Sequence, residues 1–424
     1  MSASPAATVR IARRLVDERF GIIASLYEAP CDAGAPQIFG FGSILADSTA
    51  YGFAHSGRVN GSTSPCQERA AAGAIGEAVE RYSGAYVPYD DLLYAPYASL
   101  GEDAIDPRAL VLYDDERYAA SSFLYERFDE RRVLAWVRGH SLTRRRDVLV
   151  PAFAAYIPFE RRHGEQALSQ LVTTGLACGN TVAAATYAGL TEVVERDGAM
   201  LAWLRGTPLP AVNASSATDP ALIEVLRRFA PVQDRVRLLD ATTDLGVPVV
   251  LAAYRDESGR VPAAVIASNA DLDPQRAALG ALNELAQCMT WVGSMVDAGK
   301  THALPAFDRF TEIEHHVLWP ALPEHADRLA FLFASAERRD VRALGVSGRH
   351  DEPLGACVER LARRGLEAIA VEVTSPDVAE LGLHVVRVII PGAQPLFFGS
   401  DLPRISARAR VAGMRLNLDP HPYP

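Results

Sequence analysis

The amino-acid sequence predicts a mixed α/β fold with packed helices in one large domain. Short runs rich in Val, Ile and Leu, which are typical of strands, alternate with long Ala-rich segments that are typical of helices. The strand-like runs are residues 148–150, 249–254, 368–373 and 384–391. Of the 424 residues, 49% are hydrophobic and 22% are charged, which is enough for a large core. No Gly/Ser-rich or Pro-rich linker separates blocks of different composition.

The same pattern indicates which parts of the chain belong together. We expect residues 1–12 to be a flexible N-terminal segment and residues 13–424 to form a single domain that ends in a Pro-rich tail. Strands and helices do not follow the regular order of a doubly wound fold. The Rossmann pattern Gly-x-Gly-x-x-Gly and the P-loop pattern Gly-x-x-x-x-Gly-Lys-Ser/Thr are both missing from the sequence. A bound nucleotide would therefore need phosphate contacts of another kind.

Composition disfavours several classes of protein. A formal net charge of −10 argues against a nucleic-acid-binding protein, which needs clustered Lys and Arg against phosphates. The five cysteines are isolated, without the spacing of a disulfide framework or a zinc site. The sequence has no apolar run long enough to cross a bilayer and no signal sequence. We therefore expect a cytoplasmic protein that binds neither nucleic acid nor membrane.

Three segments of the chain share one sequence pattern. Each has a polar start, an Ala-rich body and a Glu that is followed three residues later by Glu or Gln. These segments are residues 61–84, 177–198 and 269–289. We interpret them as three related helices.

The expected ends of these helices follow from capping chemistry. Ser64 is expected to cap the first helix and Asp273 the third, because each is followed by Pro at the first helical position. Asn180 or Thr181 is expected to cap the second helix. Gly84 stands where a left-handed residue would end the first helix.

Two of the helices carry a pair of glutamates. Positions i and i+3 lie on one face of a helix, so Glu77 with Glu80 and Glu192 with Glu195 present two carboxylates side by side. Adjacent carboxylates stay ionised at little cost only in water or around cations. Hard oxygen ligands are those that Mg²⁺ prefers when it bridges a protein to nucleotide phosphates. The doublets therefore predict a site for Mg²⁺ and a nucleotide between paired helices.

An exposed helix surface is the alternative explanation for these glutamates. Glu77 with Arg81 and Glu192 with Arg196 are favourable i,i+4 pairs, which are ordinary on a solvated helix face. Ala, Gly, Val and Leu surround both doublets, however, and this context indicates burial. Because the doublet also occurs twice, a metal site is favoured over two solvated faces.

The residues around the doublets resemble a known family. The strings GEAVERYSG (76–84) and GLACGNTVAAATYAGLTEVVERDGAMLAW (175–203) resemble the two signature helices of the YcaO family, and ALNELAQ (281–287) is similar to its third. The segment VEVTSPDVAELGLHVVRVIIPGAQPLFFG (371–399) resembles the family's C-terminal strand and loop region, and LVDERFGIIASL (15–26) resembles its opening. The resemblance covers nearly the whole chain.

This resemblance implies a YcaO-like fold with an ATP site between the helices, in which Mg²⁺ ions neutralise the phosphates. The carboxylates that it implies as Mg²⁺ ligands are Glu77, Glu80, Glu192 and Glu195. The further residues that it implies as nucleotide contacts are Asn180, Arg196 and Gln287.

The C-terminal tail carries a separate resemblance. Alternating Pro420, Pro422 and Pro424 stiffen the segment in an extended form and remove amide donors. A frayed terminus is the ordinary alternative. The Pro-x-Pro-x-Pro ending resembles that of azoline-forming YcaO proteins, in which the tail reaches the active site. This implies that the three prolines are part of the catalytic site and that the terminal carboxylate accepts a proton. We also expect that removing the tail spares folding.

The function implied by the resemblance is ATP-dependent peptide cyclodehydration. A Cys, Ser or Thr side chain of a ribosomally made precursor peptide attacks the preceding amide, whose oxygen is phosphorylated and lost, giving a thiazoline or an oxazoline. The implied partners are the leader-bearing precursor peptide, a separate leader-binding protein and a second copy of the chain in a homodimer. Two alternatives remain open. One is a related enzyme that forms a thioamide or an amidine, and the other is a nucleotide-binding accessory protein without chemistry of its own.

Overall fold

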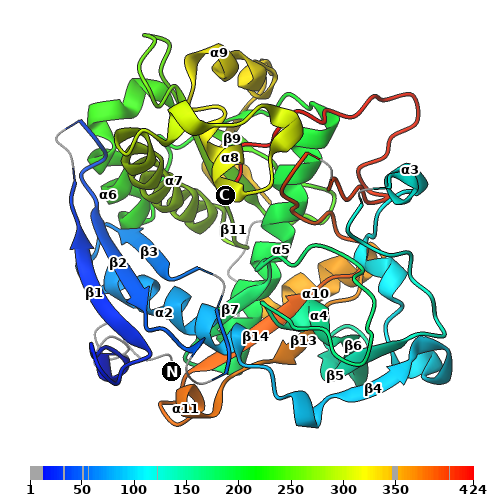
Figure 1. The fold of residues 1–424 in the computed structure, drawn as a ribbon. Coiled ribbons are helices and arrows are strands. Elements are labelled where there is room, and N and C mark those ends of the chain that lie inside the picture. The colour runs from blue at the N-terminus through cyan, green and yellow to red at the C-terminus, as the bar shows by residue number, and fades with distance from the viewer. Residues whose placement is uncertain are drawn as a thin grey trace.

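The structure is a computed structural model that describes residues 13–31, 34–49, 52–55, 57–121, 123–345, 352–400 and 402–424. The expected flexible segment at residues 1–12 lies outside the described residues. The described part is a mixed α/β arrangement of three sheets with helices packed between them, as predicted (Figure 1). Within this part, no helix combines the length and the apolar character that crossing a membrane requires.

The strands form three sheets of different size. The first sheet is antiparallel and contains β1 (Ile23–Ala29), β2 (Phe39–Leu45) and β3 (Val59–Ser64), in that order. The second has the order β11 (Ala264–Ala270), β10 (Val249–Arg255), β9 (Val236–Asp240), β8 (Ala211–Asn213) and β12 (Arg338–Asp340). The third has the order β4 (Leu93–Pro96), β5 (Val133–Ser141), β13 (Ile369–Glu372), β14 (His384–Ile389) and β7 (Leu176–Gly179), with β6 (Arg146–Pro151) paired to β5.

The four predicted strand regions are confirmed as β6, β10, β13 and β14. β10 and β14 are buried along nearly their whole length, because their continuous apolar runs are covered on both faces. β3 carries the sequence VNGSTS, whose small and polar residues have no strand-like pattern. Such strands form through pairing with their neighbours rather than through their own propensity.

The helices differ greatly in length. The longer ones are α2 (Gln67–Ala85), α5 (Val182–Arg205), α6 (Pro220–Arg228), α7 (Pro274–Asp297) and α10 (Pro353–Arg363). The short ones are α3 (Asp115–Ala119), α4 (Ala152–Ala155), α8 (Ile313–Leu318), α9 (Pro323–Ala326) and α11 (Pro376–Ala379). The three predicted related helices are therefore real, as α2, α5 and α7.

Each of these three helices packs between two sheets. α2 contacts β2 and β3 of the first sheet and β7 and β14 of the third. α5 contacts β7 and β14 of the third sheet and β10 and β11 of the second, while α7 contacts β10 and β11 and also β3. Figure 1 shows α5 running through the centre of the molecule. The three helices therefore surround one central region that all three sheets border.

Capping chemistry explains where two of these helices begin. The carboxylate of Asp273 accepts a hydrogen bond from the N–H of Gln275, and Pro274 occupies the first helical position of α7, as predicted. Of the two candidates at the start of α5, Thr181 is the cap, because its hydroxyl accepts from the N–H of Ala184 at 3.1 Å.

Both predicted ends of α2 are wrong. Ser64 is the last residue of β3, and α2 begins at Gln67 after Cys66, which makes no side-chain cap. The hydroxyl of Ser64 instead accepts from the N–H of Cys66 at 3.2 Å. Gly84 is not left-handed but lies within the last turn of α2. A Cβ atom there would lie 2.7 Å from Cδ2 of Leu176, so this glycine lets β7 pack closely against the helix.

Candidate functional site

On each of the three central helices, a glycine packs directly against a neighbouring segment about one turn before a glutamate. A Cβ atom at these glycines would lie between 2.2 and 2.5 Å from the neighbouring chain, closer than real Cβ atoms come. The glycine and glutamate pairs are Gly73 with Glu77 on α2, Gly189 with Glu192 on α5, and Gly280 with Glu284 on α7. For Glu77 and Glu192, the close approach brings the carboxylate near the backbone of an adjacent segment.

Three of the glutamates accept hydrogen bonds from backbone N–H groups of such segments. The bonds run from Gly61 to Oε2 of Glu77 (2.8 Å), from Cys178 to Oε1 of Glu80 (2.9 Å) and from Gly175 to Oε2 of Glu192 (3.0 Å). Backbone donors orient a carboxylate without supplying a formal charge. These bonds do not neutralise the carboxylates, and of the three only Glu77 also pairs with a cation within the described residues, Arg81 at 3.3 Å.

The fourth predicted glutamate lies in a buried network on α5. Glu195 is 4% exposed, and its Oε1 accepts from the hydroxyl of Ser268 at 2.7 Å and from Nη1 of Arg196 at 2.8 Å. Nη2 of Arg196 lies 3.6 Å from Oε1 of Glu284 on α7. Arg196 thus pairs with Glu195 and Glu284, whereas Glu77 does form the i,i+4 pair with Arg81, at 3.3 Å. One half of the exposed-helix alternative, the pair of Glu192 with Arg196, is therefore not formed.

The electrostatics of this region show an excess of negative charge. Burial raises the pKa of Glu80 to about 8, and repulsion from Glu77 and Glu192 adds to this against the attraction of Arg81. Burial also raises the pKa of Glu195 and of Glu284, although the guanidinium of Arg196 opposes the rise. The carboxylates that converge here are Glu77, Glu80, Glu192, Glu195 and Glu284. Additional cations in this region would favour their ionised forms.

The residues fit magnesium ions that are shared with a nucleotide. Among the described residues, no three His, Cys, Asp or Glu side chains are close enough to hold a metal ion by themselves. Mg²⁺ commonly takes only one or two protein carboxylates and completes its shell with water and phosphate oxygens. Separate carboxylates around one negatively charged region suit that mode better than an all-protein cage. Nε of Arg196, which is buried without a hydrogen-bond partner, offers a donor for phosphate.

The remaining predicted nucleotide contacts border the same region. Asn180 follows β7 directly, two residues after Cys178, whose N–H binds Glu80. Gln287 lies one turn beyond Glu284 on α7, and a Cβ atom at Gly61 would be 3.8 Å from its Nε2. Glu284 itself was not among the site residues predicted from the sequence. A signal for it existed, because Glu284 with Gln287 repeats the i,i+3 spacing of the two doublets.

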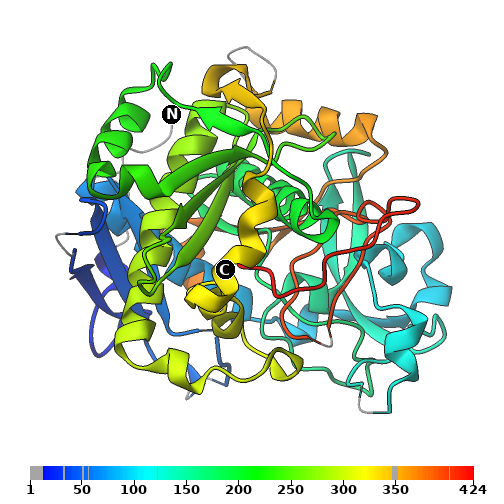
Figure 2. The same ribbon diagram turned by 90° about the horizontal axis from the view of Figure 1, so that it is seen from above.

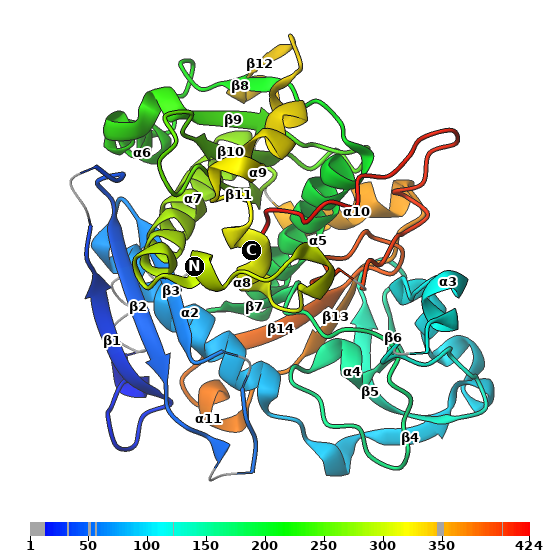
Figure 3. The ribbon, with the colours of Figure 1, turned by 45° about the horizontal axis from the view of Figure 1, so that its top comes forward.

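The C-terminal tail is packed into the interior rather than frayed. Residues 420–423 are buried, and Tyr423 is 0% exposed. The indole N–H of Trp203 on α5 donates to the carbonyl of Asp419 at 2.9 Å, and its ring contacts that of Tyr423 edge-on. Figures 2 and 3 show this end of the chain in the middle of the molecule. This burial argues against our expectation that removing the tail spares folding.

Arg196 connects the tail to the carboxylate region. Its charge lies close enough to His421 and Tyr423 to affect the pKa of both side chains. The tail and the converging glutamates are therefore neighbours, although Asp419 is 224 residues away in sequence from Glu195 (419 − 195). Rigid placement of the tail near the predicted site is thus supported by the structure.

Two stacked histidines hold the tail in position. The rings of His316 on α8 and His421 stack with centroids 4.3 Å apart, and both residues are 1% exposed. Nδ1 of His316 donates to the carbonyl of His421 at 3.2 Å, and its Nε2 accepts from the N–H of Gly399 at 3.0 Å. Nε2 of His421 donates to the carbonyl of Phe397 at 2.5 Å. Because Nε2 of His316 accepts a hydrogen bond, this imidazole must be neutral.

Acid is expected to destabilise the protein through these histidines. Burial lowers the pKa of His421 to about 4, with repulsion from Arg196 adding to the shift, and burial also lowers the pKa of His316. Below pH 6.5 the unfolded chain gains a proton that the folded chain excludes until about pH 4, so stability falls as pH falls through this window. Through His421 alone, the free energy of unfolding is expected to be about 2 kcal/mol lower at pH 5 than at neutral pH.

Urea unfolding at pH 7 and pH 5 measures this effect. His421→Gln should lose less stability between the two pH values than the wild type, while His140→Gln on the exposed face of β5 should lose as much as the wild type. Equal losses in His421→Gln and the wild type would show that His421 does not cause the acid sensitivity.

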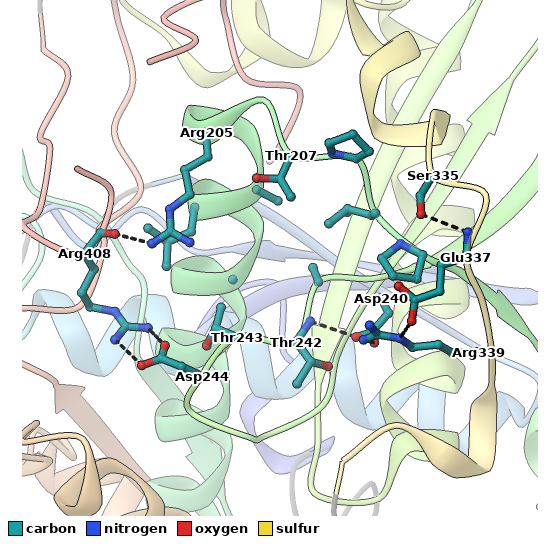
Figure 4. Close-up of a pocket in the computed structure, with 17 residues that line it drawn as sticks. Arg205, Thr207, Asp240, Thr242, Thr243, Asp244, Ser335, Glu337, Arg339 and Arg408 are labelled. Atoms are coloured by element: carbon teal, nitrogen blue, oxygen red, sulfur yellow. Dashed lines mark hydrogen bonds and ion pairs between the residues drawn. The ribbon is translucent and has the colours of Figure 1, made fainter. Parts of the chain in front are cut away.

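A larger cavity of about 690 Å³ lies beside the C-terminal turn of α5 and the edge of the second sheet (Figure 4). Two of its three arginines have acidic partners, since Arg339 lies 2.7 Å from Asp240 and Arg408 lies 2.7 Å from Asp244. The third, Arg205, donates to the backbone carbonyl of Arg408. The five converging glutamates are not among its lining residues. The larger cavity and the region of converging glutamates are therefore two different sites.

Comparison with known proteins relates this architecture to one family. Residues 62–394 match the family model described as YcaO cyclodehydratase, ATP- and Mg²⁺-binding. The chain is also similar to an uncharacterized protein of Methanothermobacter thermautotrophicus, with 30% identity over 347 residues that cover 81% of this chain and 82% of that protein.

Solved structures share the fold. A heterocyclase in complex with substrate and cofactor matches with a TM-score of 0.76 and 23% identity over 96% of this chain, which spans 54% of the heterocyclase, about half its length. YcaO from Methanopyrus kandleri, bound with AMPPCP and Mg²⁺, matches with a TM-score of 0.67 and 24% identity over 92% of this chain and 91% of that chain. A chain of the E. coli microcin synthetase McbBCD complex matches with a TM-score of 0.66 and 14% identity, over 96% of this chain and 99% of that chain.

Proposed function

The chain belongs to the YcaO family, and we propose that it uses Mg²⁺ and ATP to cyclodehydrate Cys, Ser or Thr residues of a ribosomally synthesised precursor peptide. The family binds ATP and Mg²⁺. The observation that carries the proposal is that glutamates from α2, α5 and α7 converge around Arg196. The carboxylates of this region outnumber its cationic side chains. Preorganised charges of this kind are the main protein contribution to phosphoryl transfer.

In this proposal each predicted residue keeps a definite role. The residues that hold magnesium are Glu77, Glu80, Glu192 and Glu195, with Glu284 orienting Arg196 beside them. The residues that contact the nucleotide are Asn180, Arg196 and Gln287. When bound, ATP with Mg²⁺ supplies the phosphoryl group that makes the amide oxygen a leaving group. The backbone donors at Gly61, Cys178 and Gly175 keep the carboxylates oriented before any ligand arrives.

The overall change in the peptide balances without an additional reactant. The side-chain thiol or hydroxyl loses its proton as its sulfur or oxygen bonds to the preceding carbonyl carbon. The carbonyl oxygen leaves as part of inorganic phosphate, and the amide nitrogen loses its proton to form the C=N bond. The products are an azoline, ADP and inorganic phosphate. We propose that Pro420, Pro422 and Pro424 are part of the catalytic site for this reaction. Their support is the burial of residues 420–423 next to Arg196.

The test is mass spectrometry of a leader-bearing precursor peptide incubated with the chain, ATP and Mg²⁺. We expect a loss of one water mass per ring, with ADP and phosphate released in equal amounts. Replacement of the amide oxygen by sulfur or nitrogen would indicate a thioamide or an amidine instead. An unmodified peptide under all conditions would contradict the proposal and favour an accessory role.

The same assay tests the partner. A chain of this fold occurs in the McbBCD complex, and we propose that a separate leader-binding protein presents the precursor to this chain. Adding that protein should increase the rate strongly, whereas full processing by the single chain would contradict the need for it.

A further inference from the structure

A small cavity of about 100 Å³ lies between β14, the segment at 169–174 and the loop at 390–395. Two arginines line it, Arg387 from β14 and Arg404 from the segment that leads to the tail. Arg387 is 7% exposed and Arg404 is 6% exposed. The cavity therefore contains two charged side chains that are more than nine-tenths buried.

The hydrogen bonds of these arginines are made to neutral backbone groups. Arg387 donates from Nε to the carbonyl of Ala154 at 3.1 Å and from Nη2 to the carbonyl of Val172 at 2.7 Å, while its Nη1 is buried without a hydrogen-bond partner. Arg404 donates from Nε to the carbonyl of Val111 at 2.8 Å. Carbonyl oxygens satisfy N–H groups, but they do not neutralise a guanidinium.

Neither arginine lies within ion-pair distance of a carboxylate in the described part of the chain. The acidic side chain whose charge reaches Arg387 is Glu192, which is already held by the N–H of Gly175. The groups around Arg404 are phenols, which stay neutral in this setting. Burying a cation without a counter-charge is costly, and burial lowers the pKa of Arg387 to about 10.

We propose that this cavity binds a small tetrahedral oxyanion of the phosphate class. Guanidinium groups bind phosphate oxygens with strong, directional hydrogen bonds, and the free Nη1 of Arg387 supplies one such donor. Ser169 and Thr174 are also among the residues that line the cavity. Its volume corresponds to about three water molecules, which suits an inorganic oxyanion and is far too small for a nucleotide.

The position of the cavity suggests where the anion comes from. Thr174 precedes Gly175, whose N–H binds Glu192, so the cavity adjoins the carboxylate region at that contact. If the proposed function holds, inorganic phosphate is released nearby as a product. Only this source rests on the proposed function, because binding of phosphate to the cavity does not require any turnover.

The experiment measures the melting temperature of the nucleotide-free chain in increasing inorganic phosphate at constant ionic strength. A ligand that binds only the folded state raises the melting temperature with its concentration. The wild type is expected to show this rise with phosphate and with sulfate but not with chloride. In Arg387→Met and Arg404→Met, the concentration for half of the rise should increase by roughly tenfold or more. A rise with acetate alone would overturn the assignment to a tetrahedral oxyanion.

Three controls separate this cavity from other anion effects. Arg138→Met, on β5 with 80% of its side chain exposed, should keep the wild-type response. Saturating AMPPCP with Mg²⁺ should leave the phosphate effect in place, as should Glu195→Gln. Loss of the effect in either of these two cases would place phosphate in the carboxylate region and overturn the proposal, as would an unchanged response in both cavity variants.

If one of the methionine variants fails to fold, Arg404→Lys provides the second test. Lysine keeps the positive charge but loses the planar fork of donors. We expect weaker phosphate binding with little change in the chloride response. A phosphate response equal to that of the wild type would contradict a role for the guanidinium.

Discussion

Glu195→Gln is expected to lower ATP-dependent turnover by about hundredfold or more while leaving the fold at least as stable as that of the wild type. Glu195 is 4% exposed, and burial raises the pKa of its carboxyl, so its negative charge is kept at a cost in stability. A glutamine amide oxygen can still accept from Ser268 and Arg196. The variant therefore removes charge from the proposed magnesium site with little change in shape.

The measurements are phosphate release, cyclised peptide and urea unfolding for the same preparations. Glu359→Gln on α10 is the matched control, because Glu359 forms an i,i+4 pair with Arg363 in which both side chains are 71% exposed. This control should change neither turnover nor stability appreciably. Unchanged turnover in Glu195→Gln would show that the phosphoryl-transfer site does not depend on Glu195. A large loss of stability with unchanged turnover would make Glu195 a structural residue.

Tyr423→Ala is expected to destabilise the protein by about 3–5 kcal/mol, the usual cost of removing a fully buried aromatic side chain. Tyr423 is 0% exposed and lies in the same core as Trp203, Met200 and Leu204 of α5. The loss would open a cavity between the tail and α5. Under conditions where the variant remains folded, the rate of cyclisation should fall while binding of the nucleotide and Mg²⁺ largely survives. The reason is that backbone N–H groups outside the tail hold the glutamates.

Tyr423→Phe is the control for this prediction. The hydroxyl of Tyr423 is buried without a hydrogen-bond partner, so its removal should preserve or increase stability. Urea unfolding and rates of cyclisation measure both variants. Wild-type cyclisation in folded Tyr423→Ala would contradict the proposed catalytic role of the tail. Nucleotide binding that is lost together with cyclisation would instead indicate that the tail supports the whole carboxylate region.

The features that could be predicted from the sequence are those that depend on residues close together in the chain. The apolar runs predicted β10 and β14 because a continuously apolar segment is stable only when both faces are covered. Asp273 was identified as a cap, and Thr181 as one of two candidates, because a side-chain oxygen can satisfy an N–H two or three residues away. The i,i+3 glutamates were recognised as shared faces because helix geometry alone brings them together. The caps of α2 were mispredicted, since pairing of β3 with β2 holds Ser64 in a strand.

Which of these residues contact one another depends on how segments that are far apart in the chain pack together. The N–H of Cys178 binds Glu80 across 98 positions (178 − 80), and the hydroxyl of Ser268 binds Glu195 across 73 (268 − 195). Arg196 could pair with Glu192 along its helix, but Glu284 on another helix offers a partner that sequence spacing does not reveal. The buried tail and the arginines at 387 and 404 likewise depend on segments far apart in the chain. Such contacts form when helices pack between sheets, and no local periodicity encodes the distance between them.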